Sequence, residues 1–142
     1  MVLMKMNWFW LAVVSLFALS FLFIFFRKLT SIGLKSEVLL MYYFGIVAVI
    51  FGFYAFSNRA SFQLTQLQII FLIAAGIAGV VGNLFLVESL RVAPNPGYTS
   101  AVVAGNVILV SIAAVFIFQS ELSLVKGAGI VLAVIGIILL GL

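Results

Sequence analysis

The sequence contains neither histidine nor cysteine among its 142 residues. Without imidazole and thiol groups, the chain cannot build the usual zinc or haem sites, carry out thiol redox chemistry or use imidazole as an acid–base catalyst. Because the chain has no cysteine, its sequence does not indicate whether the protein works in an oxidising or a reducing compartment. We therefore expect no metal site, no cofactor and no catalytic residue, and predict that the protein is not an enzyme.

Charged residues are also scarce. Seven lysines and arginines and three glutamates make up 7% of the chain, whereas 67% of its residues are hydrophobic. A soluble domain has about 45–50% apolar and about 25% charged residues, so this chain cannot cover its apolar surface by folding on itself. A mean hydropathy of +1.45 excludes a cytosolic enzyme, a secreted domain and a disordered regulator. The few cations are scattered between apolar runs, which argues against nucleic acid as a partner and for a multi-pass protein of the cell membrane.

A helix that crosses the bilayer needs about 20 consecutive apolar residues. Five such runs predict an all-α, polytopic membrane protein in which residues 1–142 form a single five-helix domain. The first run exceeds the apolar region of a signal peptide and is followed by Arg27 and Lys28 rather than a cleavage site, so we interpret it as a retained helix. The predicted spans cover about residues 8–26, 38–56, 67–91, 98–118 and 125–142.

The connection between the third and fourth spans contains both prolines of the chain, Pro94 and Pro96. Proline cannot continue a helix, so this segment predicts a tight antiparallel hairpin.

The cations are divided almost evenly between the two sides of the membrane, although an excess of Lys and Arg in short loops is what sets orientation. One interpretation is a fixed topology with the four-cation side in the cytoplasm. The other is dual insertion, in which oppositely oriented copies pair as an antiparallel homodimer and reproduce the inverted repeats of secondary transporters. One side carries Lys5, Arg59 and Lys126, and the other carries Arg27, Lys28, Lys35 and Arg91.

The C-terminal half resembles the EamA-type domain of the drug/metabolite transporter superfamily. The resemblance rests on the segment Glu88–Pro94 before the fourth span, on Phe118–Glu121 after it, and on Gly129 and Gly136 in the fifth span. Members usually join two inverted five-helix units in one chain, and this chain resembles one such half transporter. It departs from the family at Gly105, where a proline is frequent, and at Ser120, where a glycine usually precedes the acid.

Two amides are candidates for substrate binding. Asn83 and Asn106 lie at equal sequence distances from the hairpin midpoint, which predicts equal depths near the bilayer midplane. An inverted partner would add a second pair and complete a central polar band, where such transporters bind substrate. The alternative is that the amides only join neighbouring helices by hydrogen bonds.

Glu88 is the only acid inside a predicted span, three residues before Arg91. An i,i+3 ion pair at the membrane interface is one interpretation. A substrate- or proton-binding carboxylate is the other, because intramembrane charges are usually functional. Tyr98, at the mouth of the hairpin, adds a ring and a hydrogen-bond donor as a further candidate substrate contact.

Small residues recur along three of the spans and let helix backbones approach closely. We expect them to serve helix packing or to act as hinges during transport. The positions concerned are Gly79, Gly82, Gly105, Gly129 and Gly136.

Together with the resemblance, these patterns predict a secondary transporter of small organic solutes. The resemblance implies that these solutes are amino acids, metabolites or amphipathic drugs and that they are exported. The transporter would work in the lipid bilayer as an antiparallel homodimer, by alternating access. The alternative is a non-transporting structural or regulatory membrane subunit that requires a different partner chain, since small-residue faces and few polar groups fit that role equally well.

Overall fold

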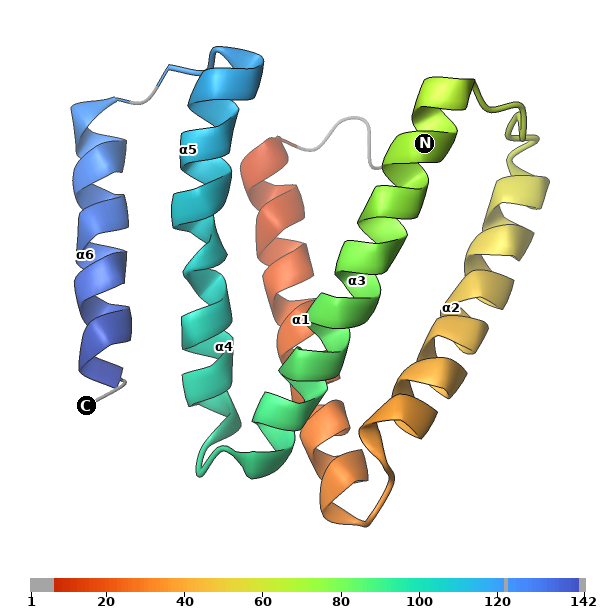
Figure 1. Cartoon of the computed structure of the whole chain (residues 1–142), viewed down its shortest axis with the longest axis horizontal. Coiled ribbons are helices and arrows are strands. Elements are labelled where there is room, and N and C mark those ends of the chain that lie inside the picture. The colour runs from red at the N-terminus through yellow and green to blue at the C-terminus, as the bar shows by residue number, and fades with distance from the viewer. Residues whose placement is uncertain (1–6, 122, 141–142) are drawn as a thin grey trace. The chain divides into compact units, whose positions relative to one another are not determined.

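In the computed structural model, which describes residues 7–121 and 123–140, all regular secondary structure in those ranges is helical (Figure 1). Helices satisfy every backbone hydrogen bond within one segment, which is what a bilayer demands of an apolar chain. The helices are α1 (Trp8–Ser31), α2 (Ser36–Ser57), α3 (Gln66–Val92), α4 (Pro96–Ala104), α5 (Asn106–Phe118) and α6 (Leu124–Leu140).

Within the described ranges, four helical segments are long and apolar enough to cross a membrane: α1, α2, α3, and α4 with α5, taken together as Pro96–Phe118. A shorter apolar helix, Gly127–Leu140, follows them. The predicted all-α, polytopic membrane fold is confirmed. The last two residues of the predicted fifth span lie outside the described residues, as does Lys5.

The described chain divides into two compact units, Met1–Val92 and Ala93–Leu142, which we call the N-terminal unit and the C-terminal unit. In the N-terminal unit, the end of α1, the start of α2 and the end of α3 converge (Figure 1). A small core forms there from Phe26, Leu39, Leu40, Val87 and Leu90, all at most 8% exposed. Lipid tails are as apolar as these side chains, so close van der Waals packing holds this end together.

Away from this core, the small residues of α3 face open space. A Cβ added at Gly76, Gly79 or Gly82 would meet no atom of the described N-terminal unit within 4 Å. Within this unit these glycines therefore do not bring α3 against α1 or α2. The face that they leave bare is available for another contact.

In the C-terminal unit, the predicted fourth span is not one continuous helix, because it is interrupted at Gly105. The Gly105 N–H donates to the Val102 carbonyl at 3.0 Å, and the Ile108 N–H donates to the Gly105 carbonyl at 3.1 Å. These i to i−3 bonds tighten the chain and separate α4 from α5. The side chain of Ile137 on α6 approaches this point so closely that a Cβ on Gly105 would lie 2.7 Å from its Cδ1.

Candidate functional site

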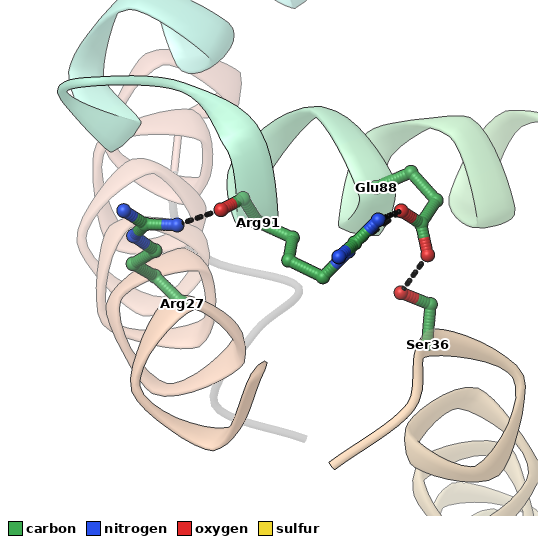
Figure 2. A network of polar contacts seen from close by, with 4 residues as sticks. All are labelled: Arg27, Ser36, Glu88 and Arg91. Carbon is green, nitrogen blue, oxygen red and sulfur yellow. Dashed lines mark hydrogen bonds and ion pairs between the residues drawn. The ribbon is translucent and has the colours of Figure 1, made fainter. Parts of the chain in front are cut away.

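Four polar residues meet where the three helices of the N-terminal unit converge, and we call Arg27, Ser36, Glu88 and Arg91 the Glu88 cluster. Figure 2 shows Glu88 between Ser36 and the Arg91 guanidinium, while Arg27 reaches the Arg91 backbone. The cluster joins the end of α1, the start of α2 and the end of α3. It lies directly beside the apolar core, so its hydrogen bonds and that packing hold the same helix ends.

The ion pair that the sequence spacing allows is formed. The Nη2 and Nε atoms of Arg91 lie 2.6 Å and 2.7 Å from Oε2 of Glu88. Both side chains are partly exposed, 51% for Arg91 and 38% for Glu88. Exposed ion pairs contribute little to stability, so this pair orients the carboxylate more than it stabilises the fold.

Ser36 is a member of the cluster that the sequence did not predict. Its Oγ donates a hydrogen bond to Oε1 of Glu88 at 2.5 Å, and the residue is only 1% exposed. The two carboxylate oxygens of Glu88 therefore have different partners, a hydroxyl from α2 and a guanidinium from α3. Local sequence does not reveal this contact, because a serine that opens a helix is usually explained by its backbone role.

Arg27 also has a role beyond that of a membrane-flanking charge. Its guanidinium donates a hydrogen bond to the backbone carbonyl of Arg91, in the last turn of α3. The last carbonyls of a helix have no partners within it and carry partial negative charge, so a cation is favourable there. Arg27 thereby links α1 to the end of α3 that carries Glu88.

Gly33 sets the path from α1 into Ser36. Its N–H donates to the Thr30 carbonyl at 3.1 Å, and the Leu34 N–H donates to the Leu29 carbonyl at 3.2 Å. This is the Schellman pattern of a helix end, which requires a left-handed residue. Gly33 supplies it with φ +96°.

Replacing Gly33 with alanine should therefore destabilise the protein, by about 1–2 kcal/mol for a left-handed L-residue. An added Cβ would touch no described atom within 4 Å, so backbone conformation alone causes the loss. Thermal unfolding of the purified protein in detergent measures it. Gly45→Ala is the matched control, because Gly45 lies inside α2 with equal space and without positive φ. Equal melting temperatures for the two variants would contradict this role for Gly33.

A cavity of about 300 Å³ adjoins the cluster. It lies at the end of the N-terminal unit that also carries Lys28 in the last turn of α1 and Glu37 in the first turn of α2. Four cations and two carboxylates thus gather at this end. The cavity is lined by Thr30, Gly33, Leu34, Lys35, Ser36, Glu37, Glu88 and Arg91.

The other predicted substrate contacts lie elsewhere. Asn83 is half-buried on α3, where its amide nitrogen donates to the Gly79 carbonyl of the same helix at 2.8 Å. Asn106 is the first residue of α5 and is exposed, and Tyr98 in α4 is 46% exposed. Asn83 belongs to the N-terminal unit and the other two to the C-terminal unit, so the equal depth of the two amides stays a prediction.

The described residues include no group of three or more His, Cys, Asp or Glu side chains that could hold a metal ion. What the Glu88 cluster offers instead is a hydrogen-bonded carboxylate paired with an arginine beside a small cavity. Such groups can bind and orient a charged solute without any covalent step.

Comparison with known proteins supports a transport role for this chain. No curated protein and no solved structure matches it. A family model does match, and it covers residues 6–142, nearly the whole sequence. The predicted resemblance is confirmed. The chain belongs to the EamA-like transporter family, and this membership, together with its apolar helices, indicates a membrane transporter of small solutes.

Proposed function

We propose that the protein exports small organic solutes across the cell membrane as an antiparallel homodimer, by alternating access. The observation that carries the proposal is the contrast within the N-terminal unit. Its helices are packed and hydrogen-bonded at the end that holds the Glu88 cluster, whereas the α3 glycines beyond it face open space. A unit closed at one end and open along its length is what one half of an alternating-access transporter requires.

Each candidate residue has a distinct role in this proposal. Glu88 recognises a charged group of the solute or couples transport to protons. Asn83 and Asn106 donate and accept hydrogen bonds near the midplane, and Tyr98 stacks on the solute. Gly79, Gly82 and Gly105 allow the helices to move, and all five spans act as one domain.

The antiparallel arrangement is supported by the distribution of charge. The four cations of one side lie at the convergent end of the N-terminal unit, and the opposite side carries three in the sequence. A difference of one cation between the two sides favours neither orientation strongly during membrane insertion. An inverted second copy would supply the second half that transporters of this plan contain.

A compartment-sensitive reporter fused to Leu142 tests the arrangement. We expect both orientations in one membrane, and a strong shift toward one of them when a lysine is added to either side. Two variants control for each other: one carries the added lysine at a span end on one side of the membrane, and the other carries it on the opposite side. A single orientation that does not respond to either addition would refute dual insertion.

Solute flux into proteoliposomes of the purified chain tests transport itself, alongside solute-induced thermal shifts. We expect at least one class among amino acids, metabolites and amphipathic cations to give both signals. Loss of both signals in a well-folded homodimer would instead favour a structural or regulatory subunit that needs a different partner chain.

A further inference from the structure

The polar cavity at the convergent end of the N-terminal unit has a cation that the transport proposal does not use. Lys35 lines the cavity and forms no ion pair among the described residues. Arg91, by contrast, is neutralised by Glu88. The adjoining backbone of α2 begins at Ser36 without a side-chain cap from Lys35. The Lys35 ammonium and the first backbone N–H groups of α2 can both donate hydrogen bonds to an anion.

An apolar groove lies next to this cavity. It has a volume of about 290 Å³, and Glu37 lines both spaces. From Glu37 the groove continues between α2 and α3, along the side chains Leu40, Met41, Phe44, Val80 and Leu84. A molecule that filled both spaces would need a charged head and an apolar tail.

We propose that the two spaces together bind one anionic phospholipid. Its phosphate lies in the polar cavity with Lys35 and the first N–H groups of α2 as donors, and an acyl chain lies in the groove. Basic pockets between membrane helices bind lipid headgroups in this way. The Glu37 carboxylate can accept a hydrogen bond from a headgroup hydroxyl, which phosphatidylglycerol carries and phosphatidylcholine lacks.

The charge at this end agrees with an anionic headgroup. In the lining of the cavity, Lys35 and Arg91 balance Glu37 and Glu88. Arg27 and Lys28 beside the cavity leave an excess of two positive charges at this end. The apolar groove distinguishes a lipid from free phosphate, because a soluble phosphate would leave it empty. This inference concerns binding alone and does not depend on whether the chain transports a solute.

Native mass spectrometry of the purified full chain in neutral detergent tests the proposal, with three probes: phosphatidylglycerol, phosphatidylcholine and glycerol 3-phosphate. We expect phosphatidylglycerol to bind most tightly. Lys35→Gln should weaken that binding about tenfold, as expected when a charge-assisted hydrogen bond is lost. Lys35→Arg should restore most of it. Lys28→Gln removes the same charge from the same end but outside the cavity, and should change binding by no more than about twofold because salt screens it.

A second variant tests the groove independently. Met41→Gln places a polar group on an exposed side chain of the groove, and should weaken phosphatidylglycerol binding without changing that of glycerol 3-phosphate. If Lys35→Gln and Lys28→Gln weakened phosphatidylglycerol binding equally, the lipid would be held only by diffuse attraction to a positive surface. That result would overturn the proposal. So would equal affinities for the two lipids, or for phosphatidylglycerol and glycerol 3-phosphate.

Discussion

Replacing Glu88 with glutamine is expected to reduce solute flux about tenfold or more while leaving the fold intact. Glutamine keeps the size of the side chain and an oxygen that can accept the Ser36 hydrogen bond, but it loses the charge that faces Arg91. Losing the charged partner of a hydrogen bond is worth about tenfold or more in binding. The ion pair is half-exposed and contributes little to stability, so melting temperature should hardly change.

Flux measured across pH separates a functional carboxylate from a merely structural one. If Glu88 binds a proton or a cationic solute, the variant should lose the part of the pH dependence that this carboxyl contributes. The ionisable groups around it are Arg91, Arg27, Lys35 and Glu37, and none of them is altered. Glu121→Gln is the matched control, since it makes the same change in the loop after α5. A pH profile identical to wild type would remove Glu88 from the mechanism.

Hydropathy and helix spacing predict much of what the structure contains. Apolar runs of membrane length leave the backbone few alternatives to helix, so the all-α fold follows from composition. The Glu88–Arg91 pair follows from spacing as well, because residues three apart share a helix face. Such local features depend on one segment at a time. They need no knowledge of which helices are neighbours.

The rest of the cluster could not be predicted in this way. Ser36 and Arg27 reach α3 because the ends of three helices converge, and no local pattern encodes that convergence. Gly33 is different, because a glycine directly after a helix with Lys in its last turn is a recognised stop signal and could have been predicted. The sequence does not predict the interruption at Gly105, because long apolar stretches continue on both sides of Gly105 and Asn106.

Replacing Gly105 with alanine is expected to destabilise the protein by about 1–3 kcal/mol, the usual result of overpacking. The new Cβ would lie 2.7 Å from Cδ1 of Ile137 and 2.9 Å from the backbone oxygen of Val102. The side-chain contact can relax by rotation, but the contact with the backbone cannot relax unless α4 and α5 shift. Flux should fall as well if the interruption is where α5 moves relative to α4.

Two further variants identify the cause of that loss. Gly129→Ala on α6 is the matched control, because its Cβ would meet no described atom of the C-terminal unit within 4 Å, and alanine favours helix. Its melting temperature should equal or exceed that of wild type. Ile137→Val removes the Cδ1 methyl, so the double variant with Gly105→Ala should recover only the side-chain part of the loss. Full recovery of stability in the double variant would mean that the Val102 carbonyl imposes no constraint. If Gly105→Ala alone lost no stability, the close approach of α6 would not require a glycine at this position.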